Sequence, residues 1–342
     1  MLERALVFVL VAMLMSAVAG ASGKTATSPT QAALEQGLKS YRVGNFAAAI
    51  GPLETAAAGS GRDAFLAQFY LARLYGDNSH PMTDHAKAYM LHQRIADANA
   101  DIDPDDDQRA PFVAKSLVAL AGYLRHGVAE IGLRPDLERA AHYLHHAATF
   151  FADEDAQFEL AKLFLTGDGI APDVRRAVHW FSVLTQRGHP GAQAFFADMH
   201  FRGKHVTASP ERALALATLA VEAAPGTERI WIEDIYQRIY CGVTEGQRKE
   251  ARQVVAEWRR KYGRDAEPEA GPGLWPTATR TCDDGRIVPV PGPRRGGGDA
   301  GLPIANGELA VSRPEANAAS AVAPVGNASA APTLLDVGNR AP

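Results

Sequence analysis

The sequence has 342 residues, with 35 lysines and arginines against 39 aspartates and glutamates, and a formal net charge of −4. It contains no block of basic residues and no basic stripe rich in aromatics, so we do not expect it to bind nucleic acid. Both ends differ in composition from the middle, which indicates several segments rather than one compact domain.

Residues 1–21 are typical of a secretory signal peptide. Arg4 precedes an apolar run over 5–15, and small residues at Ala17, Ala19 and Ala21 offer cleavage sites. A membrane anchor is the alternative, but the run is shorter than the roughly 20 apolar residues of a spanning helix. No cysteine lies nearby, which argues against a lipoprotein. We therefore expect a periplasmic protein with no stable membrane span after signal cleavage.

Residues 30–62 are predicted to form a helical pair that covers the N-terminal end of the fold. The two helices are expected over 31–42 and 46–58, and Gly44-Asn45 forms the turn between them. Asn45 has the side-chain oxygen that caps a helix N-terminus well. This pair is expected to act as a first, atypical repeat.

A two-part pattern recurs four times across residues 63–224. Its first part sets an alanine among large residues: Leu71-Ala72-x-Leu74-Tyr75, Leu120-Ala121-x-Tyr123-Leu124, Leu160-Ala161-x-Leu163-Phe164 and Phe196-Ala197-x-Met199-His200. Its second part is a capping residue, a base three places on and an alanine: Asp84…Lys87-Ala88, Asp136…Arg139-Ala140, Asp173…Arg176-Ala177 and Ser209…Arg212-Ala213.

The spacing of the second-part alanines predicts the architecture. The last three recur at intervals of 37 and 36 residues, and a period of this length built from two helices is typical of a stacked solenoid. A methyl at each alanine lets the partner helix approach closely. We therefore expect an all-α fold, a right-handed α/α superhelical solenoid of tetratricopeptide-like helical pairs.

An acidic insertion over residues 99–107 stretches the distance from Ala88 to Ala140 to 52 residues. Its acids resemble a calcium loop starting at Asp97, but Ile102 stands where a glycine is needed and Gln108 where a bidentate glutamate is needed. An exposed acidic loop is therefore expected, and inserted segments of solenoids often lie on a binding face.

Two helices, over about 229–240 and 245–262, are predicted to cover the C-terminal end of the repeats. The segment 263–342 is rich in proline, glycine and alanine, and we expect it to be mostly disordered. Cys241 and Cys282 lie outside the repeats; export would allow them to form a disulfide that ties this segment back, and two unpaired thiols are the alternative.

The residues give little support for catalysis or cofactor binding. We find no nucleophile elbow, no His-Glu-x-x-His motif, no phosphate-binding glycine loop and no CxxC motif. His142 and His146 lie four residues apart on one helical face, as metal ligands can, but no acidic partner accompanies them, so a polar surface is the favoured interpretation. We expect no enzyme activity, no metal and no cofactor.

A solenoid of this type is expected to bind another protein along the face formed by its first helices. In the first helices of the first, third and fourth units we expect two positions each to project away from the packed side, and they are occupied by Gln68, Arg73, Gln157, Lys162, Gln193 and Asp198.

The combination of an L-A-x-L-Y-x-x-G first helix with a D-x-x-K-A second helix resembles the SEL-one-like repeats, relatives of tetratricopeptide repeats. The third unit matches best, from Ala156 through Leu160-Ala161 and Gly167-Asp168-Gly169 to Asp173…Arg176-Ala177. The resemblance implies a stack of helical pairs that works by protein–protein binding.

A narrower resemblance is to the exported rhizobial regulators of exopolysaccharide synthesis known as ExoR. The likeness is strongest from Phe112 to Gly127 and continues at Gly188-His189-Pro190-Gly191-Ala192; the Cys241 segment and the long tail depart from it. It implies a periplasmic inhibitor that binds the sensor domain of a membrane histidine kinase. The alternative is a scaffold for assembly of polysaccharide export or cell-wall machinery.

Overall fold

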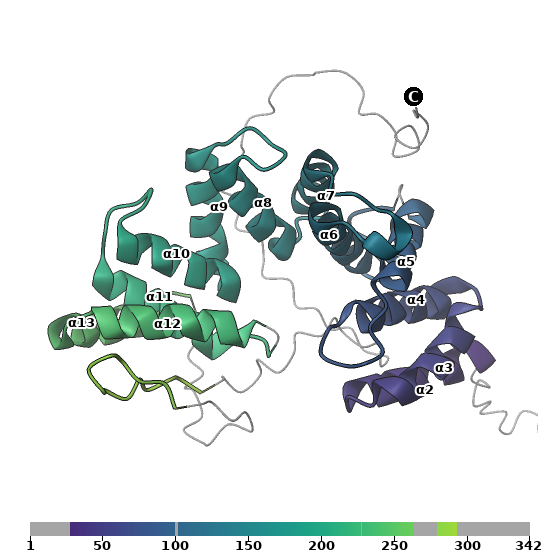
Figure 1. Cartoon of the computed structure of the whole chain (residues 1–342), viewed down its shortest axis with the longest axis horizontal. Helices are drawn as coiled ribbons and strands as arrows, with labels where there is room; N and C mark the ends of the chain where they lie inside the picture. Colours follow the sequence, from purple (N-terminus) through teal and green to yellow (C-terminus); the bar gives the residue numbers. More distant parts are fainter. Residues whose placement is uncertain (1–27, 100–101, 227, 263–278, 293–342) are drawn as a thin grey trace, which may run out of the picture. The chain divides into compact units, whose positions relative to one another are not determined.

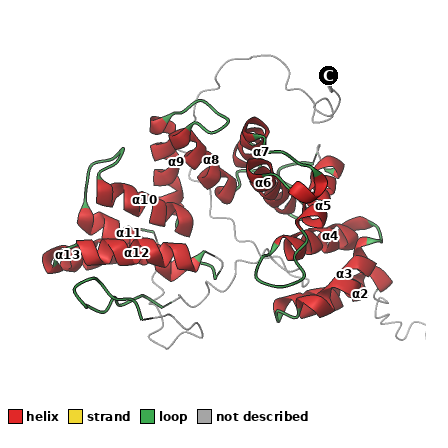
Figure 2. Cartoon of the chain, viewed as in Figure 1, coloured by secondary structure: helices red, strands yellow, loops and turns green. Residues whose placement is uncertain are grey.

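The computed structural model describes residues 28–99, 102–226, 228–262 and 279–292. In these residues twelve α-helices and one 3-10 turn account for the regular structure, and no strand is present (Figures 1 and 2). The expected signal peptide lies outside the described residues. The chain divides into an N-terminal unit, which ends at Leu91, and a C-terminal unit, which begins at His92.

The N-terminal unit contains α2 (Pro29–Arg42), α3 (Phe46–Ala57), α4 (Gly61–Gly76) and the first half of α5 (His85–Ala98). Asn45 caps α3, because its side chain accepts a hydrogen bond from the backbone N–H of Ala48 at 3.3 Å. Gly37 lets α2 lie against α3, since a Cβ at this position would come within 2.6 Å of Leu53 Cγ. The opening helices are therefore where the sequence predicts them.

The C-terminal unit is a series of consecutive helical pairs followed by two further helices. Its elements after α5 are α6 (Ala110–His126), the 3-10 turn η1 (Ala129–Ile131), α7 (Leu137–Thr149), α8 (Glu154–Thr166), α9 (Val174–Arg187), α10 (Pro190–Arg202), α11 (Pro210–Ala223), α12 (Arg229–Gly242) and α13 (Glu245–Lys261). Each helix from α6 to α11 contacts the next, and α13 lies against α11.

The repeated alanines occupy the tightest contacts of the pairs, as predicted. Each exposes at most 1% of its surface, which leaves no room for a larger side chain without displacing the partner helix. They are Ala72, Ala121, Ala161 and Ala197 in the first helices, and Ala88, Ala140, Ala177 and Ala213 in the second. The all-α solenoid expected from the sequence is therefore confirmed.

Three of the four predicted helix caps form, and the fourth does not. Asp84, Asp136 and Asp173 each accept a hydrogen bond from the backbone N–H three residues later. Ser209 stands at the N-cap position of α11, but its side chain makes no capping bond. Its hydroxyl instead donates to the Glu211 carboxylate, so the acid two residues along replaces the backbone as its partner.

The described part of the acidic insertion forms turns, and the apolar side chain of Ile102 anchors it to the protein. Ile102 is buried, whereas Asp103 and Asp105 are exposed. Asp106 accepts two bonds from the Arg109 guanidinium, at 2.9 and 2.7 Å, just before α6 begins. Ala100 and Asp101 lie outside the described residues. Burial of Ile102 also explains why the segment departs from a calcium loop at that position.

Residues 279–292, which we call the strap, belong to the segment predicted to be mostly disordered, yet they are placed against α12. The disulfide between Cys241 of α12 and Cys282 is formed. Val288 and Cys282 are both buried in the same apolar cluster as Ile232, Tyr236 and Ile239 of α12. The strap is thus an ordered part of a segment whose composition predicts disorder, because composition does not register a covalent attachment. Residues 263–278 and 293–342 lie outside the described residues.

Candidate partner-binding face

The six residues predicted to face a partner separate into two groups. The glutamines point inward: Gln157 and Gln193 are buried, and Gln68 is half-buried. Their amide groups donate to the backbone carbonyls of Ala148 at 3.1 Å, Thr185 at 3.3 Å and Ala57 at 3.2 Å, respectively. Each of these carbonyls lies in the last turn of the preceding helix.

The glutamines therefore act as braces between consecutive helices, and the prediction that they project toward a partner is wrong. The last four carbonyls of a helix have no acceptor role within that helix, so a buried side-chain donor from the next helix stabilises it. Leu117 holds the same repeat position in α6, where the insertion separates α5 from α6. There the buried Ser116 hydroxyl lies 3.1 Å from His92 Nδ1 of α5 instead.

The charged residues of the prediction are at least partly exposed. Lys162 and Asp198 leave 30% and 24% of their side chains accessible, and Arg73 is exposed. Lys162 and Asp198, which belong to the C-terminal unit, both form ion pairs with neighbouring residues. The Lys162 ammonium lies 2.5 Å from the Glu159 carboxylate and 4.7 Å from the centre of the Phe158 ring. Asp198 pairs with Arg202 at 2.8 Å and with Arg238 of α12 at 3.2 Å.

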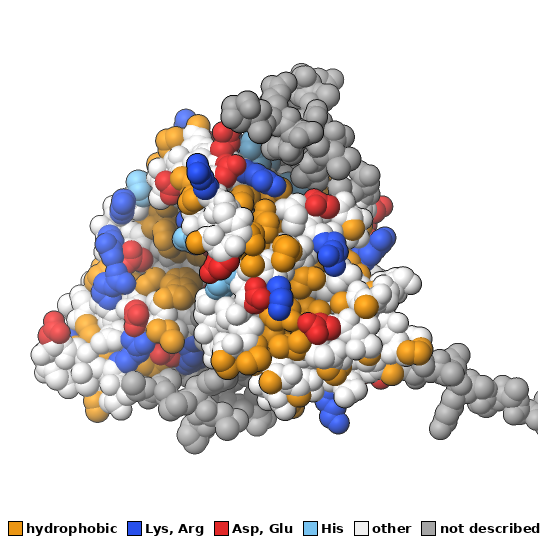
Figure 3. Space-filling model, turned by 45° about the vertical axis from the view of Figure 1, so that its right-hand side comes forward, with side chains coloured by type: hydrophobic (Ala, Val, Ile, Leu, Met, Phe, Trp, Pro, Cys, Tyr) orange, Lys and Arg blue, Asp and Glu red, His pale blue; other side chains and the backbone are white. Residues whose placement is uncertain are grey.

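These ion pairs belong to a row that runs across successive first helices of the C-terminal unit. Arg125 of α6 pairs with Glu159 of α8 at 3.1 Å, and Asp198 of α10 pairs with Arg238 of α12. Figure 3 shows positive and negative side chains interspersed with apolar ones on one face of the protein. We call the row formed by Lys115, Arg125, Asp155, Glu159, Lys162, His189 and Asp198 the charged row.

Asp155 is the centre of the charged row because it joins three successive first helices. One carboxylate oxygen lies 2.5 Å from the Lys115 ammonium of α6, and the other lies 2.9 Å from His189 Nε2 at the start of α10. Asp153, the N-cap of α8, adds a second contact to Lys115 at 2.9 Å. The other His189 nitrogen accepts from the Ala192 backbone N–H, so this histidine also caps α10.

Burial and neighbouring charges shift the pKa values of Asp155, Lys115 and the nearby Glu228. Burial alone would raise the pKa of Asp155, but the His189 hydrogen bond and the charge of Lys115 outweigh it and lower that pKa. Burial alone would lower the pKa of Lys115, whereas Asp155 and Asp153 raise it overall. Burial, with the nearby Asp155 charge, raises the pKa of Glu228. Asp155 and Lys115 therefore remain an ion pair at neutral pH.

Lys115, Asp155 and His189 were not among the residues predicted from the sequence. A usable signal existed, since Lys115 and Asp155 hold the same repeat position, immediately before Ser116 and Ala156, and carry opposite charges. Adjacent first helices bring equal repeat positions side by side, so opposite charges there predict a lateral ion pair. His189 gives no such signal because it precedes its helix rather than lying in it.

Among the histidines of α7, His146 lies in a partly buried environment next to aromatic residues. His146 stacks on Phe150 with ring centres 5.0 Å apart, and burial lowers the pKa of both His145 and His146. Across the ranges that the structure describes, no group of three or more His, Cys, Asp or Glu is placed to hold a metal ion. Within those same ranges, no helix has the length and apolar character needed to cross a membrane.

Comparison with protein families places four Sel1 repeats in the chain, at residues 66–99, 114–149, 154–189 and 190–224. Repeats of this class serve as protein-interaction scaffolds and are not an enzyme family. The matched repeats include every member of the charged row. The insertion falls between the first and second matches, so the repeat pattern resumes after it.

Two curated proteins are similar to the chain over 181 residues, which is 53% of this chain and 65% of each relative. Both are called exopolysaccharide production negative regulator; the one from Rhizobium leguminosarum bv. viciae is 29% identical and the one from Rhizobium meliloti is 28% identical. The similarity thus spans less than two thirds of the length of these relatives.

Two solved structures are also similar to the chain. One is c5321, a protective antigen of uropathogenic Escherichia coli that displays an SLR fold: TM-score 0.48, 17% identity, 73% of this chain and 52% of that one. The other is a Sel1 repeat protein from Oxalobacter formigenes: TM-score 0.44, 18% identity, 68% of this chain and 85% of that one.

Proposed function

Because the chain is a protein with four Sel1 repeats, we propose that it is a periplasmic negative regulator of exopolysaccharide synthesis. The observation that carries the proposal is its similarity, over 181 residues, to two proteins called exopolysaccharide production negative regulator. In this proposal the chain acts by binding the sensor domain of a membrane histidine kinase and restraining its output.

The charged row supplies the contact surface in this proposal. Its members are already paired laterally, so the first helices present fixed charges of both signs rather than flexible side chains. Such an arrangement favours a partner with complementary charges and disfavours others, since like charges brought together cost binding energy. Lys162 and Asp198 are partly exposed charges at equal positions of α8 and α10, and Arg73 holds the same position in α4.

A deletion of the gene tests the proposed role. Loss of a negative regulator raises exopolysaccharide output, and the full chain supplied from a plasmid restores the normal level. A scaffold for polysaccharide export predicts the opposite sign, because its loss lowers output. Lower or unchanged output in the deletion strain would therefore contradict the proposal.

Complementation with charge-reversed variants tests the charged row. We expect Lys162→Glu to restore regulation poorly, because it replaces a positive charge of the row with a negative one beside Glu159. Arg175→Glu is the matched control, since Arg175 is exposed on α9, the second helix of the same pair. Equal complementation by both variants, at equal protein levels, would remove the row from the proposed contact surface.

A further inference from the structure

The strap lies along α12 mainly through bonds from α12 side chains to its backbone. The Tyr236 hydroxyl donates to the carbonyl of Pro289 at 2.9 Å, and the Arg229 guanidinium donates to that of Pro291 at 3.0 Å. The Gln237 amide donates to the carbonyl of Thr281 at 2.9 Å. Tyr236 and Gln237 follow Arg229 by seven and eight residues, which is about two helical turns, so the three donors lie on one side of α12, which we call the stripe.

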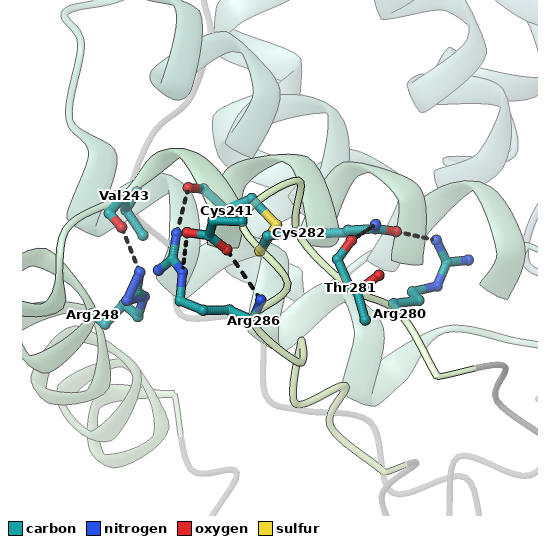
Figure 4. Close-up of a disulfide and its surroundings, with 9 residues drawn as sticks. Cys241, Val243, Arg248, Arg280, Thr281, Cys282 and Arg286 are labelled. Atoms are coloured by element: carbon teal, nitrogen blue, oxygen red, sulfur yellow. Dashed lines mark hydrogen bonds and ion pairs between the residues drawn. A yellow bond between two sulfur atoms is a disulfide. The ribbon is translucent and has the colours of Figure 1, made fainter.

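Two arginines and two valines of the strap make further contacts. Arg280 of the strap lies 3.3 Å from Glu233 and 2.5 Å from Asp234, both on α12. Arg286 of the strap reaches the carbonyl of Cys241 at 3.4 Å, beside the disulfide (Figure 4). Val288 is the strap's buried aliphatic side chain, and Val290 is partly buried in the same cluster.

One part of this attachment, the bonds from α12 to the strap carbonyls, does not depend on the side chains of the bound segment. Tyr236 and Arg229 bind carbonyls of the extended residues 288–292, whereas Thr281 lies on the other arm of a turn, opposite Ile287. Backbone carbonyls are common to all sequences, so these two donors would accept any extended chain, and Val288 fills a buried position beside them. Val288-Pro289-Val290-Pro291 suits this role, because proline holds the backbone extended and gives up no donor that the contact uses. When the strap detaches from α12, water hydrates the α12 side chains that otherwise donate to the strap carbonyls.

The disulfide is the covalent part of this attachment. Cys282 is buried, but Cys241 is partly exposed on α12. A dithiol reductant would attack one sulfur, pass through a mixed disulfide and leave as its own cyclic disulfide. That exchange transfers two electrons and two protons to the protein, which then carries two thiols. The strap would then be held by its non-covalent contacts alone.

We propose that the stripe on α12 is a peptide-binding groove that the strap occupies in the same chain, and that the Cys241–Cys282 disulfide is the latch that keeps it closed. With the latch reduced, the groove accepts an extended segment of another protein that alternates valine and proline, as the strap does. This inference does not depend on the regulatory role proposed above.

Hydrogen exchange on the full chain tests the latch. On reduction with a dithiol we expect the amides of Cys282, Gly285 and Val288, which bond within the strap, to exchange at least about tenfold faster. The helices α6 to α11 should keep their protection. The proposal fails if the strap stays protected after reduction, or if the helices lose protection with it.

Disulfide trapping tests the groove with a defined probe. The protein is the full chain with Cys282→Ser, so Cys241 is free, and the probe is a peptide of residues 279–292 whose cysteine is activated as a mixed disulfide with thionitrobenzoate. Attack by the Cys241 thiolate joins the peptide and releases the coloured thiolate. We expect this peptide to react about tenfold faster than one with the same residues in scrambled order.

A matched pair of variants separates groove binding from thiol reactivity. Tyr236→Phe removes the donor to Pro289 and should slow trapping by about three- to tenfold. Tyr240→Phe makes the same change one turn further along α12, at a residue whose hydroxyl makes none of the bonds to the strap named above, and should leave the rate unaltered. Equal rates for the native and scrambled peptides, or equal effects of the two variants, would overturn the proposal.

Discussion

The apolar side of each helix is covered differently in the middle of the C-terminal unit and at its last helices. From α7 to α10, each helix is covered by the next helix of the series, with alanines at the contacts and a glutamine brace where α8 follows α7 and where α10 follows α9. At α12 no further repeat follows in the described residues, and the strap covers the helix instead (Figure 1). The packing of α7 to α10 thus follows from residues that recur in each repeat. The packing of α12 depends instead on a few contacts with the strap.

The largest effect should come from a core residue of the regular region. Phe181 of α9 is fully buried, so Phe181→Ala should lower the free energy of unfolding by about 3–5 kcal/mol through lost apolar burial and a cavity. Val174→Ala on the same helix is the control, because Val174 is 37% exposed. Denaturant unfolding of both variants measures the difference. A similar small loss for both would mean that α9 is not part of a continuous core.

The disulfide should contribute less than Phe181 to the free energy of unfolding, and its effect should be confined to α12 and α13. Replacing both cysteines with serine should cost about 2–4 kcal/mol, mostly by loosening the chain that the bridge closes. Urea unfolding measures the total loss, and hydrogen exchange of the amides of α12 and α13 shows whether the loss is local. If the substitution destabilised α7 to α10 equally, the contrast between the two regions would be wrong.

The glutamine braces should have a smaller and position-specific effect. Gln157→Ala removes a buried donor and leaves the Ala148 carbonyl without it, so we expect a loss of about 1–2 kcal/mol. Gln186→Ala is the matched control, because Gln186 is exposed on α9. Thermal unfolding of the two variants gives the comparison. Equal stability would show that the brace adds nothing to helix packing.

The smallest effect should be a loss of stability at mildly acidic pH. Burial lowers the pKa of His145, His146 and His200 below the unfolded value of 6.5, so the unfolded chain binds more protons there. Stability should therefore fall as pH decreases from about 6.5 toward the folded-state pKa values. Glu228 has a raised pKa and opposes this trend.

Replacement of the three histidines by glutamine should flatten this pH dependence. The readout is the change in melting temperature between pH 7.5 and pH 5.5, which is compared between the variant and the natural sequence. The absolute stability of the variant does not enter the test, since only the slope is used. An unaltered slope would assign the acid response to other groups.

The fold was largely predictable because its determinants repeat. A helical pair gives its alanines, caps and large residues the same spacing each time, so the period identifies the architecture before any contact is known. Gln157 was misassigned for the complementary reason. Its polarity indicated exposure, but the carbonyl that it satisfies belongs to a helix end that only the folded stack places beside it.

The strap and the centre of the charged row could not be found in this way. A strap of valine and proline has the composition of a disordered tail, and its order comes from a disulfide and from α12 donors far away in sequence. Asp155 takes part in the charged row through Lys115, 40 residues earlier, and His189, 34 residues later. Pairings of this kind depend on how repeats stack and not on local pattern.

The most direct test of the proposed function is the binding of the purified protein to the purified periplasmic domain of the sensor kinase from the same organism, followed by calorimetry. We predict saturable binding that is weakened at least about tenfold by Lys162→Glu together with Asp198→Lys, and left intact by Arg175→Glu. Absence of heat and of complex formation, with both proteins folded and under oxidising and reducing conditions alike, would contradict the proposal that this chain regulates by engaging a kinase.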